Sequence, residues 1–302
     1  MSVRRLAALG ALILALAAPS AAIAEDPPFV GWTALLPGLS LPYDPSSPDD
    51  CIAGRSQCVD KTIRQMTSRF NSLASSCDHN AIFSLVYLRV TQEYRQTIDG
   101  PFFDDTQFVN YEDTVFAHYY FSAFDAWSAG RVQQVPTAWR ITFDAAAKHA
   151  VSAMGDLLLG VNAHVQRDLP FVLYSIGLVA PDGTSRKPDH DRVDIILNRV
   201  MDPVLAEIAR RFDPTIDDTN LPTTLDDAAL FQLLAGWRED AWRNAEALAA
   251  APTSQARNIV AAQIESNAAN EARVIEASTA YPPLLGGDSS RDAYCAVHHN
   301  DP

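Results

Sequence analysis

Hydrophobic residues recur at spacings of three and four along most of the chain. In the segment "CVDKTIRQMTSRFNSLASSC", Ile63, Met66, Phe70 and Leu73 fall on one side of a helix. The same period continues in "NAIFSLVYLRVTQEYRQTI" and in the aromatic-rich "NYEDTVFAHYYFSAFDAWSAG". The alternation typical of strands does not recur convincingly. The pattern therefore predicts an all-α protein, a single bundle of seven or eight helices.

Polar and proline-containing stretches interrupt this pattern. The segments "PFFDD", "PDGTSRKPD" and "DPTIDDTNLPTT" are typical of loops. The stretch from Thr137 to Leu178 is long enough for two consecutive helices or one kinked helix, with Pro170 as the kink or the boundary. We expect two more helices in "LDDAALFQLLAGWREDAWRNAEALAAA" and "SQARNIVAAQIESNAANEARVIEAST".

The first residues are typical of a secretory signal. A basic head precedes an apolar run from Leu6 to Ala18, and the small residues Ala22 and Ala24 suit a leader peptidase. No later stretch is long and apolar enough to span a bilayer, so we expect an exported protein, secreted or periplasmic, with no stable membrane span. The expected divisions are a signal peptide at 1–24, an extended N-terminal arm at 25–58 and a helical domain at 59–302.

All four cysteines follow this signal, at Cys51, Cys58, Cys77 and Cys295. An even number of cysteines in an oxidising compartment predicts two disulfides. Three of the four lie near the start of the chain, so at least one bridge would join that region to the C-terminal end. The sequence leaves three pairings open.

Composition narrows the class of partner. The formal net charge is -14, which repels phosphate backbones and predicts that nucleic acid is not bound. A small-molecule or lipid-like substrate fits this surface better. The hydrophobic content of 48% is enough for a sizeable core.

One segment is apolar on nearly all sides. Between His149 and Arg167 the only charged residue is Asp156, and His164 is the other strongly polar side chain. Such a helix belongs in the middle of a bundle. Its polar side chains need partners there, because an unpaired buried polar group costs roughly 1–3 kcal/mol.

The spacing His-x-x-x-Asp occurs twice in this part of the chain, as His164 with Asp168 and as His190 with Asp194. At about 100° per residue, both side chains of a pair leave the same side of a helix. Imidazole nitrogen and carboxylate oxygen are good ligands for zinc and related divalent ions. The two pairs therefore predict a metal site, with zinc as the expected cofactor, built from these four side chains.

Structural roles compete with this interpretation. Asp194 can stabilise the first turn of a helix capped by Asp191. Asp168 can pair with Arg167 or cap the segment that starts at Pro170. His164 can be a buried histidine hydrogen-bonded to a carbonyl.

Other side chains are candidates for supporting roles. Asp156 or Asp113 is a possible catalytic base, and Arg238 in "GWREDAW" can bind an anionic substrate group because guanidinium matches phosphate and carboxylate geometry. His118, which follows Glu112 and Asp113 on the same helix, and His149 are possible additional ligands.

The two pairs resemble the motif of the zinc-dependent phospholipase C and single-strand nuclease superfamily, in which His-x-x-x-Asp, Gln-Pro-x-His and a second His-x-x-x-Glu or His-x-x-x-Asp follow one another. Leu169 and Pro170 occupy the neighbourhood of the Gln-Pro step. The histidine that the family places after this step is missing, since Phe171 to Tyr174 follow instead. The resemblance implies phosphoester hydrolysis by metal-activated water, with one or two metals.

A longer likeness extends over "VYLRVTQ", "NAHVQRDLP" and "DHDRVDIILNRV". These segments resemble an uncharacterised bacterial family of helical proteins, a domain of unknown function. This likeness implies no particular chemistry.

Two hypotheses follow from the sequence. The first is a secreted metal-dependent hydrolase that acts on phosphoesters through a metal-activated water. The alternative is a non-catalytic exported helical protein that binds a hydrophobic ligand between its helices, with "FAHYYFSAFDAW" lining the pocket. The metal content of the purified protein separates the two.

Overall fold

The computed structural model describes residues 42–216, 227–281 and 287–301. In this part of the chain the secondary structure is helical, apart from two isolated β-bridges. The helices are α2 (Ser56–Ser75), α3 (Ala81–Thr97), α4 (Thr106–Ser128), α5 (Thr137–Ala147), α6 (Ala153–Val161), α7 (Leu169–Ile176), α8 (Lys187–Arg211), α9 (Asp227–Ala250), α10 (Ser254–Thr279) and α11 (Gly287–His298). The predicted all-α class is confirmed.

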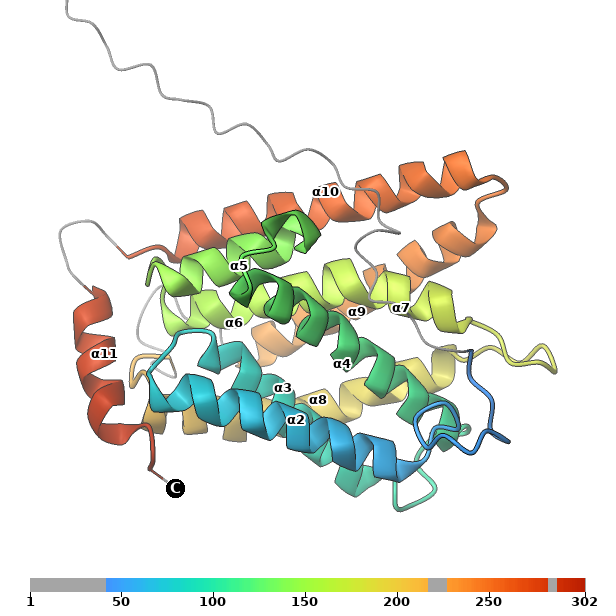
Figure 1. Cartoon of the computed structure of the whole chain (residues 1–302), viewed down its shortest axis with the longest axis horizontal. Coiled ribbons are helices and arrows are strands. Elements are labelled where there is room, and N and C mark those ends of the chain that lie inside the picture. Colours follow the sequence, from blue (N-terminus) through green and yellow to red (C-terminus); the bar gives the residue numbers. More distant parts are fainter. Residues whose placement is uncertain (1–41, 217–226, 282–286, 302) are drawn as a thin grey trace, which may run out of the picture.

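The predicted number of helices was too low. A π-helical turn, Asn162–Asp168, joins α6 to α7, so these two segments form one continuous helix and the described residues contain nine helices. The unexpected helix is α11, which stands across one end of the bundle (Figure 1). Its sequence, "GDSSRDAYCAVH", has few apolar residues and lacks the hydrophobic period of the longer helices.

Two helix boundaries differ from those expected. Helix α2 begins at Ser56, three residues before the predicted start of the helical domain at 59. The predicted signal peptide, and the predicted arm as far as residue 41, lie outside the described residues. Helix α8 begins at Lys187 within the expected loop, because Pro188 fits the first turn and Asp189 is an acid near the helix N-terminus.

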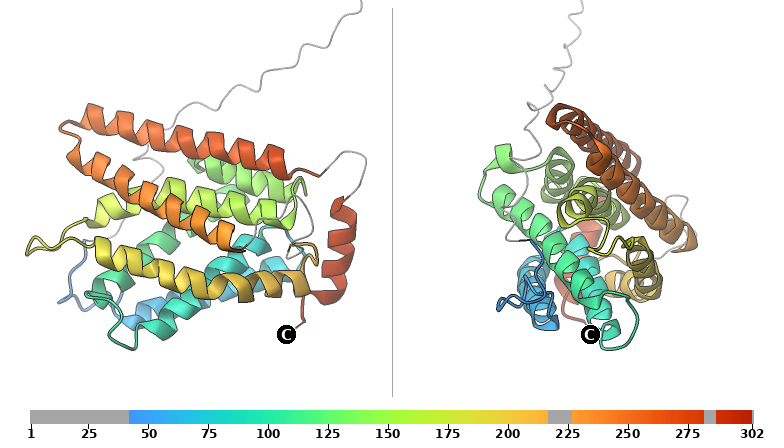
Figure 2. Two further views of the ribbon diagram at one scale, coloured as in Figure 1. Left: turned by 180° about the vertical axis from the view of Figure 1, so that it is seen from behind. Right: turned by 90° about the vertical axis from the view of Figure 1, so that its right-hand side faces the viewer.

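The continuous helix of α6, the π-helical turn and α7 runs through the interior, as its apolar sequence predicts. Its segments contact α3, α4, α5, α9 and α10, and the two views of Figure 2 show these helices surrounding it. The side chains of Leu157, Leu159 and Ala163 are at most 1% exposed. The helix that carries Asp156 and His164 therefore lies at the centre of the bundle.

The π-helical turn changes the direction of the side chains that it carries. Pro170 lacks an amide hydrogen, and its ring would clash with the preceding turn of an ordinary α-helix. The wider π-helical turn ends at Asp168, and Pro170 is the second residue of α7. The assumption of about 100° per residue therefore does not hold between Asn162 and Asp168.

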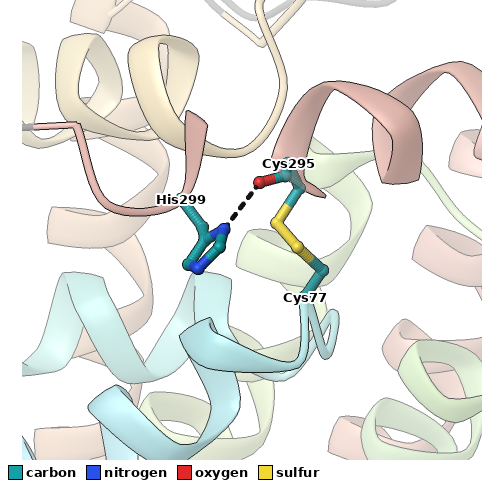
Figure 3. A group of neighbouring side chains, drawn as sticks. All are labelled: Cys77, Cys295 and His299. Carbon is teal, nitrogen blue, oxygen red and sulfur yellow. Dashed lines mark hydrogen bonds between the residues drawn. A yellow bond between two sulfur atoms is a disulfide. The ribbon is translucent and has the colours of Figure 1, made fainter. Parts of the chain in front are cut away.

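Two disulfides join the four cysteines, as predicted: Cys51 to Cys58 and Cys77 to Cys295. The second bridge attaches α11 to the turn between α2 and α3 (Figure 3). The expected connection between the start and the end of the chain is thus made by Cys77. Among the described helices, none has the length and apolar composition that a membrane crossing requires.

Candidate functional site

A cavity lies at the centre of the bundle, beside the π-helical turn. The volume of this cavity is about 110 Å³. Most of its wall is apolar, from α3, α4, α8 and α9 together with the central helix. Its polar side chains are Tyr87, Tyr94, Glu112, Asp113, His164 and Arg238. The volume suits several water molecules or a small ligand.

His164 is held in one orientation by Asp168. Its Nδ1 lies 3.3 Å from Asp168 Oδ2, and its ring stacks on Phe116 with centroids 3.5 Å apart. Burial lowers the pKa of His164, although the neighbouring Asp168 opposes this shift. The neutral ring therefore donates from Nδ1 to the carboxylate, and Nε2 carries a lone pair.

Asp168 in turn is fixed by two donors from outside the pair. Trp139 Nε1 donates to Oδ2 over 2.7 Å, and Arg167 Nη1 donates to Oδ1 over 2.8 Å. Arg167 also donates from Nε to Glu265 Oε1 over 2.8 Å. The pairing of Asp168 with Arg167 that competed with a metal role is thus present. The network makes Asp168 a residue that positions His164.

Two adjacent carboxyl groups of α4 face the same cavity. Burial raises the pKa of Glu112 to about 7, against the opposing charges of Arg238 and Arg186. Burial, and then the nearby Glu112, raise the pKa of Asp113 to about 7. Both carboxyls therefore change protonation state near neutral pH, as groups at functional sites often do.

Several polar atoms at this cavity have no hydrogen-bond partner in the protein. They are Tyr87 Oη, Asp113 Oδ2 and His164 Nε2. The rings of Tyr87 and His164 lie 4.5 Å apart, so at least these two groups are neighbours. Buried polar atoms usually find partners, and a concentration of unpaired ones in one cavity indicates a place for a ligand or for water.

A second, smaller cavity lies beside the first and is lined by apolar side chains. The two share Val86, Val90, Val161, Leu197 and Leu234. The remaining wall of the second cavity is also apolar and includes Met201, Val204 and Trp237. Of the aromatic run expected to line a pocket, Phe116 borders the main cavity.

The second predicted pair is placed differently. Asp194 accepts from Arg238 Nε over 2.6 Å, while His190 Nε2 lies 3.3 Å from the carbonyl oxygen of Arg238. The structure therefore brings His164 and Asp168 together, but His190 and Asp194 are each joined to Arg238. The guanidinium predicted to bind substrate lies in the cavity wall and already has a carboxylate partner.

The other four sequence candidates lie in different places. Asp113 borders the central cavity, whereas Asp156 is buried beside Arg291, 2.7 Å from its Nη1. His118 is exposed on α4. His149 ends α5 and contacts Asp292 of α11.

Among the described residues, two groups of three side chains bring possible ligand atoms within 4.8 Å of one another. One consists of Cys77, Cys295 and His299, but its two sulfur atoms are bonded to each other (Figure 3). The other consists of His79, His149 and Asp292. The four ligands predicted from the pairs belong to neither group, and a metal bound by them stays a prediction.

A family model described as a family of unknown function (DUF5995) matches residues 59–278, well over half of the chain. The chain belongs to this family. Every residue that lines the two cavities lies within the range matched to DUF5995, whereas α11 lies beyond it. The expected membership of an uncharacterised family is confirmed. No curated protein and no solved structure matches the chain, and none of the comparisons supports the likeness to zinc-dependent phospholipases and nucleases.

Several residues of the site were not found from the sequence. Tyr87, Trp139 and Glu265 each belong to a helix whose local pattern is ordinary. Their proximity to His164, Asp168 or Arg167 depends on packing between distant segments, which residue spacing does not report. A buried acid such as Glu265 gives only a weak signal, a charge flanked by the apolar Ile264 in a helical pattern.

Proposed function

We propose that this protein binds a small, mainly apolar molecule in the central cavity, as the alternative hypothesis from the sequence anticipates. The observation that carries the proposal is a mainly apolar cavity whose few polar side chains include atoms without a hydrogen-bond partner. Ligand sites commonly combine an apolar wall with a few polar groups that fix orientation.

The unpaired polar atoms of the cavity favour a ligand that donates a hydrogen bond. His164 Nε2 is an acceptor because Nδ1 donates to Asp168, and Asp113 Oδ2 is an acceptor when the carboxyl is ionised. Arg238, the cation in the wall, is already paired with Asp194. A ligand with an alcohol or amine head group therefore fits these atoms better than a carboxylate does. The hydrocarbon part of the ligand would contact the apolar wall and extend towards the second cavity.

The binding experiment uses straight-chain probes of equal length with an amine, an alcohol or a carboxylic acid at one end. We expect the amine and the alcohol to raise the melting temperature at pH 7, and the acid to have little effect, in calorimetric titrations and thermal scans. Asp113→Asn should weaken the binding of the amine most, because it removes the negative charge nearest the ligand.

A cavity-filling variant separates this site from non-specific binding. Val90→Phe places a larger side chain in the wall that both cavities share. The matched control is Val274→Phe on the surface of α10, where the wild-type side chain is 67% exposed. Loss of probe binding in the first variant alone supports the proposal. Equal binding by both variants, or no binding by the wild type, contradicts it.

Catalysis by the same side chains is a second candidate function. A histidine oriented by a carboxylate, with its other nitrogen unpaired in a cavity, is the arrangement of a general base or of a metal ligand. This observation supports the metal-dependent phosphoester hydrolysis predicted from the two His-x-x-x-Asp pairs. The bound water would be the nucleophile, and Asp113 is the candidate base that shares the cavity with His164.

Metal analysis and a phosphodiester assay test this second candidate. Tag-free protein should contain stoichiometric zinc and hydrolyse bis(p-nitrophenyl) phosphate. The double variant His164→Ala/His190→Ala should lose both properties while keeping its helical circular dichroism. Protein that binds no zinc at these histidines and does not hydrolyse the probe would leave ligand binding as the function.

A further inference from the structure

A second cluster of metal-binding side chains lies away from the central cavity, where α11 meets the bundle. His79 comes from the turn between α2 and α3, His149 follows α5, and Asp292 belongs to α11. Asp292 lies 2.9 Å from His79 Nε2 and 2.8 Å from His149 Nδ1, using one carboxylate oxygen for each. The two imidazole rings stack with centroids 4.0 Å apart. Three segments that are distant in sequence thus converge on one point.

His79 is the buried member of this cluster. Its side chain is 2% exposed, and its second nitrogen, Nδ1, has no hydrogen-bond partner. That nitrogen lies 3.6 Å from Asp156 Oδ2, which also accepts from Arg291. Asp156 was singled out in the sequence as an isolated charge in an apolar helix, and the structure places it directly behind His79.

The unpaired nitrogen of His79 faces a carboxyl group. A neutral histidine that donates from Nε2 to Asp292 turns the lone pair of Nδ1 towards the carboxyl group of Asp156. A metal ion on Nε2 reverses the arrangement, because Nδ1 then carries the proton and faces an acceptor. Carboxylates stand behind metal-bound histidines in this way.

The backbone at His149 is also specialised. His149 has φ of 51°, in the left-handed region, and its amide donates to Ala146 while the amide of Ala150 donates to Ala145. This is the hydrogen-bond pattern of a helix end at which glycine is the usual residue. A histidine here is less favourable than glycine for the backbone alone, but it places an imidazole against Asp292.

We propose that His79, His149 and Asp292 bind one zinc ion. Two imidazole nitrogens and one carboxylate are a donor set that suits zinc, and three protein ligands leave a fourth position for water. The site is separate from the central cavity, because none of its three side chains lines that cavity. Zinc would link α11 to the two turns on which it rests.

The test is a zinc titration of the full chain, with its disulfides intact, in competition with a chromophoric chelator. We expect one zinc ion per chain in the wild type. His149→Ala and Asp292→Asn should each weaken zinc binding by at least about tenfold, since loss even of a supporting residue has effects of 10–100-fold. These two side chains are 37% and 36% exposed, so both variants should fold.

His118→Ala is the matched control, because it removes an exposed histidine that belongs to neither group of possible metal ligands among the described residues. It should bind zinc as the wild type does, and circular dichroism should show that all three variants are folded. Unchanged zinc affinity in His149→Ala and Asp292→Asn, or no zinc binding by the wild type, overturns the proposal. Loss of zinc only in His164→Ala/His190→Ala would instead assign the ion to the two sequence pairs.

Discussion

Asp113 illustrates how a single buried carboxyl can make stability depend on pH. Its pKa is raised to about 7 in the folded protein from a usual value of 3.8, mainly by burial and then by Glu112. Between these two values the unfolded chain has lost the proton and the folded chain has kept it. The free energy of unfolding therefore falls as pH rises from about 4 through 7, and the whole cost is present above pH 7.

Asp113→Asn should remove this dependence. Relative to the wild type, the variant should gain stability progressively as pH rises from 4 to 8, by on the order of 1–3 kcal/mol at the upper end. Urea denaturation at a series of pH values measures the difference. Asp202→Asn, a substitution at an exposed position of α8, is the control and should show no such trend. A constant difference between Asp113→Asn and wild type at all pH values would show that burial does not perturb this carboxyl.

The chemistry of individual residues was only partly predictable from the sequence. The spacing of His164 and Asp168 predicted that these side chains meet, and they do, at 3.3 Å. The same spacing did not bring His190 and Asp194 into contact with each other, because both contact Arg238 of α9 instead. Spacing reports which side chains share a helix face. It does not report which groups the neighbouring helices place against that face.

At the scale of elements, hydrophobic period identified the long helices well, since each buries one side in a shared core. It failed for α11, which is short and has a single buried apolar residue among those described, Cys295. That helix depends on a covalent bond and on polar contacts, which leave little trace in the hydrophobic pattern. The π-helical turn was also not foreseen, although Pro170 marked its position.

Gly160 controls how closely α6 approaches α3. A Cβ atom added at this position would lie 2.4 Å from Phe83 Cγ, whereas one added at Gly236 in α9 would meet nothing within 4 Å. We therefore expect Gly160→Ala to destabilise the protein by about 1–3 kcal/mol through overpacking. Gly236→Ala should stabilise it by roughly 0.5–1 kcal/mol, because alanine favours the helix and nothing opposes it.

Thermal and urea denaturation of the two glycine variants provide the measurement. The prediction depends on their opposite signs, which a general effect of alanine on helix stability cannot produce. If Gly160→Ala were as stable as Gly236→Ala, Phe83 would have to move aside without cost. Because Phe83 also borders the central cavity, ligand binding by Gly160→Ala would then show whether the cavity had changed.

For the whole molecule, the Cys77–Cys295 bridge joins the most distant residues of the two disulfides, with a sequence separation of 218. In the chain-entropy model such a bridge restricts the unfolded state, and the typical contribution is about 2–4 kcal/mol. The double variant Cys77→Ala/Cys295→Ala should be destabilised by about this amount in urea denaturation. Added reductant should then have a smaller effect on the variant than on the wild type. Equal stability of variant and wild type would mean that the bridge does not stabilise the folded state relative to the unfolded chain.

The same bridge has a consequence for the zinc proposal. Cys77 is two residues from His79, and Cys295 is three residues from Asp292 on α11, so one covalent tether keeps two of the three ligands at high effective concentration. In a reducing compartment the disulfide would be reduced. The free energy of zinc binding would then have to offset the entropic cost of docking α11. Whether the protein holds zinc would then depend on where in the cell, or outside it, the chain matures.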